Sequence, residues 1–409
     1  PTASPHVGID LIITHTPESD DPRGHRPERI ARTRMYRGGG LDVASDPGSR
    51  TPVAERSSSD EAFQDPTLIE AEGSGGAILD AKHWTRALAS YCDPDPRRSV
   101  FELVVTAVPF ALLWTSLALC LQAGNWWGLL LTVPTALFLV RLFMIQHDCG
   151  HGSFFRSRAM NDAVGRVIGV LTLTPYDYWR RTHAEHHATT GNLDRRGMGD
   201  VTTLTVAEYR ALSRWGRMTY RLMRHPVVML GIGPFYIFVL KHRLPFGLMD
   251  KGPKPWVSTM ATNLVIAALV VGVGATVGFG TFLMVQIPIT LLSGAMGIWL
   301  FYIQHQYEDA YWERDEDWNF HAGALLGSSH YDLPVVLRWL TANIGIHHVH
   351  HLASRIPSYR LSTAIKEHPE LAAMGRLTLR QSLRCFRWRL WDEQGRRMVT
   401  FRDLQTLPA

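Results

Sequence analysis

The chain has 409 residues, of which 46% are hydrophobic and 19% charged, and its formal net charge at pH 7 is +5. This apolar content suffices for a large core or a membrane domain. The arginines are spread over several loops instead of one basic patch, so a nucleic-acid-binding protein is not expected. The four cysteines are scattered along the chain, which excludes a disulfide framework.

The first part of the chain differs in composition from the rest. Residues 1–80 are rich in Pro, Gly, Ser, Asp and Arg and show no helical or strand periodicity, so we predict a disordered N-terminal extension. No apolar stretch of signal-peptide type occurs in the first hundred residues. We predict one domain over residues 81–400, opening with a short amphipathic helix, and a C-terminal tail at residues 401–409.

Four apolar runs of about 20 residues each are long enough to cross a membrane as helices. They are residues 101–122, 126–146, 256–277 and 279–304. Each pair is joined by a very short turn, so the runs predict two helical hairpins. A further apolar stretch, residues 226–240, is short for a span and is expected to lie in the interface or to enter the bilayer and return.

Four spans place both ends of the chain and residues 147–255 on the same side of the membrane. These regions contain nearly all the lysines and arginines, whereas the two hairpin turns contain none. The positive-inside rule therefore predicts that this side is cytoplasmic. We predict an all-α, multi-pass integral membrane protein with four transmembrane helices, in contact with membrane lipids.

Three histidine clusters lie next to these spans or between them. Histidines three and four residues apart share a face of a helix, so each cluster can direct several ring nitrogens to one place. The clusters are His147 and His151; His183, His186 and His187; and His347, His350 and His351. Imidazole is a good ligand for transition metals. We interpret the three clusters as one metal site assembled from distant parts of the chain.

The number of histidines limits the kind of metal site. Eight imidazoles exceed the four ligands of a structural zinc ion, so two ions explain them better than one. No Cys-x-x-Cys motif accompanies them, and a thiolate zinc site or an iron–sulfur cluster is therefore not expected. The spacing does not decide between iron and zinc.

Other residues near the clusters have weaker assignments. His348 breaks the spacing, and we expect it beside the ligands or facing solvent. Ligating histidines usually donate their second N–H to a carboxylate or carbonyl group. Candidates for this role are Asp148, Glu185, Asp194 and Asp332, with surface ion pairs as the alternative.

The segments around the clusters resemble the membrane-bound fatty acid desaturases, specifically the acyl-lipid omega-6/delta-12 group, over about residues 100–400. The segments that carry the resemblance are Pro175–His183, Ala188–Asp200, Phe301–Trp312, Tyr331–Pro334 and Asn343–Leu352. The resemblance implies a four-helix membrane stem with a cytoplasmic helical cap that holds two non-haem iron ions. It also implies a ninth ligand between the second and third clusters. His305 is the matching position; without the resemblance it would be an isolated histidine at a helix end.

The resemblance also implies an activity. A desaturase introduces a double bond into an acyl chain carried on lipid, CoA or a carrier protein, with O2 as co-substrate. All nine histidines would then serve catalysis as iron ligands. No fused cytochrome b5 domain is evident, so electrons are expected from a separate donor such as ferredoxin or cytochrome b5.

Two alternatives remain at this point. A hydroxylase, epoxygenase or conjugase on the same scaffold would have the same clusters. A histidine-rich metal transporter would place ionisable ligands near the middle of the bilayer, whereas the clusters here lie beyond the ends of the spans.

Overall fold

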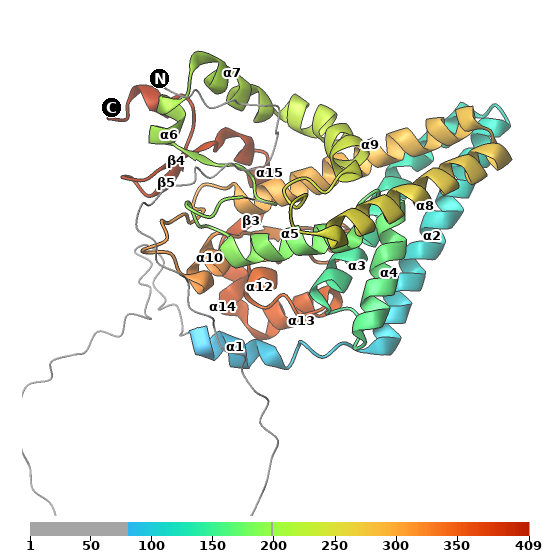
Figure 1. The fold of residues 1–409 in the computed structure, drawn as a ribbon. Helices are drawn as coiled ribbons and strands as arrows, with labels where there is room; N and C mark the ends of the chain where they lie inside the picture. Colours follow the sequence, from blue (N-terminus) through green and yellow to red (C-terminus); the bar gives the residue numbers. More distant parts are fainter. Residues whose placement is uncertain (1–80, 198, 409) are drawn as a thin grey trace, which may run out of the picture. The chain divides into compact units, whose positions relative to one another are not determined.

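The structure, a computed structural model, describes residues 81–197 and 199–408 (Figure 1). The predicted disordered extension, residues 1–80, lies outside these residues. The described chain is mostly helical, as predicted, and its long apolar helices form a stem from which shorter helices extend as a cap.

Four helices of 25 to 27 residues form the stem and confirm the predicted spans. They are α2 (Pro96–Gln122), α3 (Thr132–His151, continuing a 3-10 turn at Trp126–Leu131), α8 (Pro253–Val277) and α9 (Phe279–His305). At 1.5 Å per residue each is about 40 Å long, which exceeds the hydrocarbon thickness of about 30 Å.

The ends of these helices differ from the prediction in a way that matters for the site. Helix α2 begins before residue 101 because the Asp95 side chain caps it, accepting hydrogen bonds from the N–H groups of Arg97 and Arg98. Helices α3 and α9 run past residues 146 and 304 to end at His151 and His305. The first histidine cluster and His305 therefore lie on the last turns of membrane helices.

The stem buries one face of its helices and exposes the other. Leu117 of α2, Leu139 of α3 and Ile289 of α9 belong to one apolar core. Leu112 of α2 and Leu264 of α8 lie on outer faces and are more than half exposed. Such exposure of large apolar side chains suits a hydrocarbon environment.

A buried ion pair joins α2 to α3. Arg141 of α3 is buried, with 4% of its surface exposed. Its guanidinium pairs with Glu102 and donates to the Thr106 hydroxyl at 3.0 Å. It also donates to the carbonyl of Trp339 and lies over the Trp339 ring, 4.0 Å from the centroid. Arg141 thus ties the cap to the stem.

The segment between the two hairpins is helical and closely associated with α8 and α9. It contains α4 (Arg158–Leu171), α5 (Tyr176–Thr189), α6 (Val206–Ala211), α7 (Arg214–Met223), π-helical turns at Val228–Ile232 and Phe235–Leu240, and a 3-10 turn at Lys241–Arg243. The chain bends by 64° between α7 and Val228–Arg243, as in a broken span or a re-entrant loop. A re-entrant course is one of the two expected for residues 226–240, whereas a broken span would add a fifth crossing. Residues 228–243 are called the re-entrant segment below.

Short helices and strands complete the cap. The helices are α1 (Ala81–Ala89), α10 (Phe320–Leu326), α11 (Val335–Leu340), α12 (His347–Leu352), α13 (Ser358–Glu367), α14 (Pro369–Ala373) and α15 (Leu379–Ser382). The strands are β1 (Leu204–Thr205), β2 (His330–Asp332), β3 (Arg376–Thr378), β4 (Leu390–Asp392) and β5 (Arg397–Val399). β1 pairs parallel with β4 and β4 antiparallel with β5, while β2 pairs parallel with β3.

The residues predicted as a C-terminal tail, 401–409, are packed as far as residue 408. The Phe401 ring lies 5.3 Å from that of Tyr209, and Arg210 donates to the carbonyls of Leu404 and Leu407 at 3.1 and 2.9 Å. These contacts hold the chain end against α6 and α7.

Candidate metal centre

All nine histidines singled out from the sequence meet at the junction of stem and cap. They come from four helices: α3, α5, α9 and α12. Helix α3 stops directly after His151 because Gly152 adopts a left-handed conformation, with φ of 68°. The rings therefore gather at the ends of the membrane helices and away from their centres, the position that argued against a transporter.

The rings form two groups, and within each group the potential ligand atoms lie within 4.8 Å of one another. The first group is His147, His151, His183, His187 and His350. The second group is His186, His305, His347 and His351. The two groups touch where the rings of His187 and His351 stack, with centroids 4.0 Å apart.

Helix geometry explains how one cluster serves both groups. Successive residues on a helix are about 100° apart, so residues i and i+4 differ by about 40°, whereas i+3 and i+4 differ by about 100°. On α5, His183 and His187 join the first group and His186 the second. On α12 the pair His347 and His351 joins the second group, and His350 the first.

The ring nitrogens approach one another as ligands of one ion do. In the second group, Nε2 of His305 lies 3.2 Å from that of His186 and 3.0 Å from that of His347. In the first group, Nε2 of His187 lies 3.2 Å from that of His183 and 3.1 Å from that of His350. With metal–nitrogen bonds of about 2.1 Å, neighbouring ligands lie about 3.0 Å apart around an octahedral ion and about 3.4 Å apart around a tetrahedral one.

Hydrogen bonds at Nδ1 orient two rings of the second group. The His305 Nδ1 lies 3.1 Å from the carbonyl oxygen of Gly327 and must donate to it. The His186 Nδ1 is bonded to the carboxylate of Asp200 and also donates. In the neutral rings the proton is then on Nδ1, so two Nε2 lone pairs face each other. A cation between them removes this repulsion.

A third ring of the second group is oriented in the same way. The Thr190 hydroxyl donates to the His186 carbonyl at 2.7 Å, so it accepts from Nδ1 of His351, which lies 3.3 Å away. In the first group, Nδ1 of His147 is 3.4 Å from Asp148, and its buried Nε2 has no partner among the described residues. These residues fit a metal-binding site because they present lone pairs to a common point.

The four predicted carboxylates have different places. Asp148 lies beside His147, and its second oxygen accepts from the Ser358 N–H at 2.8 Å. Glu185 is exposed on α5, and among the described residues its carboxylate has no hydrogen bond or ion pair with a histidine. Asp194 pairs with Arg314, and Asp332 pairs with two arginines. Of the four, only Asp148 is in contact with a histidine ring of the two groups.

Asp200 is the carboxylate that the sequence analysis missed. It bonds Nδ1 of His186 and also accepts from the Gly197 N–H at 3.2 Å. Gly199 allows the loop to approach α5, because a Cβ there would lie 3.2 Å from the Thr182 carbonyl oxygen. Asp200 stood at the end of a segment that carried the resemblance, but its distance from His186 in sequence gave no helical signal.

Burial favours the neutral form of five imidazoles on α5 and α12. The pKa values of His183, His187 and His350 lie well below the ordinary histidine value, first because the rings are buried and further because other rings surround them. The same causes lower the pKa of His347 and His351. Neutral imidazole is the form that binds metal.

His348 is separate from both groups. It is fully buried, and its Nε2 donates to the Leu371 carbonyl at 2.8 Å, so the expectation that it might face solvent was wrong. Burial lowers its pKa to about 3. Its hydrogen bond fixes α12 against the start of α14.

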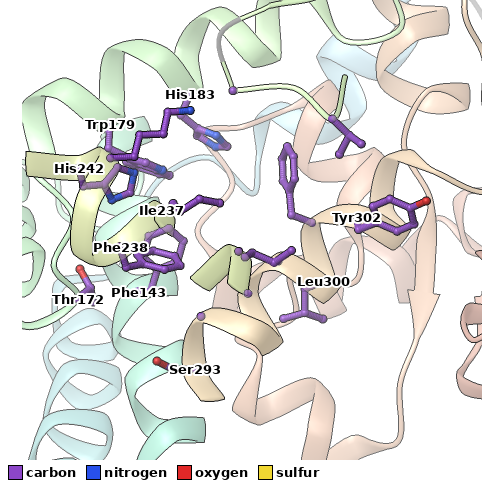
Figure 2. A pocket seen from close by; sticks show the side chains of 18 of the residues that line it. Phe143, Thr172, Trp179, His183, Ile237, Phe238, His242, Ser293, Leu300 and Tyr302 are labelled. Atoms are coloured by element: carbon purple, nitrogen blue, oxygen red, sulfur yellow. The ribbon is translucent and has the colours of Figure 1, made fainter. Parts of the chain in front are cut away.

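A largely apolar cavity of about 350 Å³ reaches the metal centre. His147, His183 and His347 contribute to its wall. Figure 2 shows Phe143, Ile237 and Phe238 gathered below Trp179 and His183, with Leu300 and Tyr302 across from them. The size is in the range of ligand-binding cavities, and the lining suits a hydrocarbon chain.

The re-entrant segment separates this cavity from the surroundings of the stem. Ile237 and Phe238 line the cavity, whereas Ile232, Phe235 and Leu240 of the same segment are exposed. Gly294 of α9 allows close packing here, since a Cβ at this position would lie 2.8 Å from Pro234 and 3.0 Å from Phe238.

Comparison with known proteins agrees with this architecture. The profile of the fatty acid desaturase family matches residues 124–382. A fatty acid desaturase of Bacillus subtilis is 44% identical over 328 residues, which cover 80% of this chain and 93% of the relative.

More distant relatives carry more detailed names. An sn-1 acyl-lipid omega-3 desaturase (ferredoxin) of Nostoc is 30% identical over 233 residues, or 54% of this chain and 62% of the relative. An sn-1 oleoyl-lipid 12-desaturase of Anabaena variabilis is 26% identical over 305 residues, or 70% of this chain and 81% of the relative. The chain belongs to the fatty acid desaturase family, and it is an oxidoreductase that desaturates acyl chains.

Proposed function

We propose that the two histidine groups each hold one iron ion, and that this di-iron centre desaturates the acyl chain of a membrane lipid lying in the cavity. The nine ligands are those of the two groups defined above. Electrons come from a separate donor, and the centre faces the cytoplasm.

The facing lone pairs of His186 and His305 carry this proposal. When both rings are neutral and both Nδ1 atoms donate, the unprotonated Nε2 atoms lie 3.2 Å apart, and a bound metal ion would make that approach favourable. The all-imidazole donor set suits iron, zinc or copper. Iron is preferred because the reaction needs an oxidant made from O2, which zinc does not form.

Bound iron would supply the oxidising power that removes hydrogen from unactivated methylene groups, a step that acids and bases cannot perform. The chain itself holds and orients the substrate. Phe143, Ile237 and Leu300 enclose the acyl chain and exclude water, while His147 and His183 lie in the same wall. Asp200 and the Gly327 carbonyl fix the tautomers of His186 and His305.

Three further parts of the proposal have independent support. The turns of both hairpins, residues 123–125 and Gly278, contain no lysine or arginine, and the opposite side is rich in arginine. Membrane lipid as acyl carrier follows from the exposed apolar faces of the stem and from the acyl-lipid names of the Nostoc and Anabaena relatives. The Nostoc name also supports ferredoxin as the donor, with cytochrome b5 as the other candidate.

The test combines metal analysis with product analysis. The purified protein is expected to contain about two irons per chain by mass spectrometry, and a host lacking polyunsaturated lipids should gain unsaturated acyl chains on expression. The His186→Ala variant should lose iron and product while remaining in the membrane. His225→Ala, outside both groups, is the control. Iron-free protein with full activity, or hydroxylated products in place of alkenes, would contradict the proposal.

A further inference from the structure

A buried arginine in the cavity wall has no acidic partner. Arg224 directly follows α7, at the bend before the re-entrant segment, and is 5% exposed. It lines the same cavity as His183 and His347. None of the roles assigned above to the metal centre uses it.

The hydrogen bonds of Arg224 leave part of its guanidinium unused. Nη2 donates to the side-chain oxygen of Gln306 at 2.5 Å and to the Arg389 carbonyl at 3.3 Å. Nε and Nη1 are buried and have no partner among the described residues. The guanidinium lies 5.3 Å from the ring centroid of Tyr302 and 5.6 Å from that of Tyr220.

The surroundings add positive charge. Burial lowers the pKa of Arg389, and the charge of Arg224 lowers it further. The hydroxyl of Tyr220 donates to the Arg389 carbonyl at 2.6 Å, and that of Tyr302 to the Trp388 carbonyl at 3.2 Å. Among the described residues, no carboxylate forms an ion pair with Arg224. A buried cation without a counter-ion is unfavourable, so this part of the cavity is complementary to an anion.

We propose that Arg224 is a positioning residue that binds the phosphate of the phospholipid whose acyl chain enters the cavity. This inference rests on the proposed function, since it assigns the head of that substrate. The two free N–H groups offer a phosphate oxygen charge-assisted hydrogen bonds, which a guanidinium makes well.

The position of Arg224 favours a lipid phosphate as the source of the anion. Helix α7 exposes Trp215, Met218 and Leu222, a pattern typical of helices that lie at a membrane surface. Arg224 lies between this helix and the segment that re-enters, where a lipid headgroup would lie while its acyl chain runs into the apolar part of the cavity. A free fatty acid would instead offer a carboxylate.

The test measures binding without turnover. Equilibrium dissociation constants of dipalmitoyl phosphatidylglycerol, dipalmitoylglycerol and palmitate are measured in detergent micelles without O2, for the iron-loaded full-length protein. The wild type should bind the phosphate-bearing lipid about 10- to 100-fold more tightly than the uncharged diacylglycerol, the size expected for hydrogen bonds to a charged group. Arg224→Gln should remove this preference, and Arg224→Lys should keep part of it.

Controls separate this role from a structural one. Arg214→Gln removes the same charge from the exposed start of α7 and should leave the preference unchanged. Iron content and unfolding temperature report whether Arg224→Gln folds, and Arg224→Lys carries the test if it does not. In turnover, KM for the phospholipid should rise more than kcat falls.

Several results would overturn the inference. The preference for the phosphate-bearing lipid could survive Arg224→Gln, or this variant could lose affinity equally for all three ligands or for palmitate alone. Binding of inorganic phosphate alone, in competition with the lipid, would also overturn it. If the lipid preference depends on Arg224 but no lipid is desaturated, the inference stands and the proposed function fails.

Discussion

Asp200 offers a direct test of how the metal centre is held. Its carboxylate bonds Nδ1 of His186, and both side chains are buried, with 7% and 1% of their surfaces exposed. Solvent therefore screens this interaction little. In Asp200→Ala, His186 keeps its place on α5 but loses the acceptor that fixes its tautomer and increases its basicity.

The expected magnitude follows from the role of such partners. Removing the hydrogen-bond partner of a ligating histidine typically costs 10- to 100-fold in metal affinity or activity, equivalent to about 1.4 to 2.8 kcal/mol. Asp200→Asn should lie toward the lower end, since its amide oxygen can still accept from Nδ1 but carries no charge. Only the ion of the second group should be affected strongly, because His186 belongs to that group alone.

Metal affinity can be measured by competition with a chelator, with metal release followed for the two ions separately. Glu185→Gln is the matched control, since it removes a carboxylate from the exposed face of the same helix. The reasoning is refuted if Asp200→Ala holds both ions as tightly as the wild type, or if Glu185→Gln weakens them equally.

Three other predictions concern stability and the cavity. The pKa values of buried rings such as His183 and His351 are lowered, so below the ordinary histidine pKa of about 6.5 the unfolded chain binds more protons than the folded chain. Metal-free protein should therefore lose thermal stability as the pH falls from 7 to 5. An unfolding temperature that does not change with pH would contradict this prediction. Glu102→Gln leaves Arg141 buried without its anion and should lower the free energy of unfolding in detergent by about 3–5 kcal/mol. The double variant Glu102→Gln with Arg141→Met should recover much of this loss. A Cβ at Gly297 meets no atom within 4 Å and points to free space in the cavity wall, so Gly297→Phe should fill the cavity and reduce product at least 10-fold with iron retained. The control is Gly272→Phe, on the exposed face of α8. Equal activity of the two variants would argue against this cavity as the acyl site.

The spans and the histidine clusters could be predicted because their signals are local. An apolar run of about 20 residues and a spacing of three and four residues are properties of single helices. His305 has no such spacing, and only the family resemblance indicates it as a ligand. Its place in the second group depends on α9 ending beside α12, which is a long-range property.

Residues that act through distant partners could not be found in this way. Asp200 reaches His186 because a loop turns back onto α5, and Arg224 meets the cavity because the chain bends after α7. Glu185 illustrates the opposite case: it was expected beside a ligating histidine, but its side chain is exposed. It lies two positions from His183, which is about 200° around the helix, so helical geometry already placed its side chain away from the ring.

In the proposed centre, the division of ligands between helices makes the two metal positions interdependent. Helix α3 supplies only the first group and α9 only the second, whereas α5 and α12 supply both. A shift of α5 or α12 that displaces one ion therefore moves ligands of the other. Because α3 and α9 belong to the membrane stem and α5 and α12 lie outside the four spans, binding of either ion also fixes these helices to the stem. Metal loading should thus stabilise the junction that contains the cavity, and the site and its acyl-binding cavity form together.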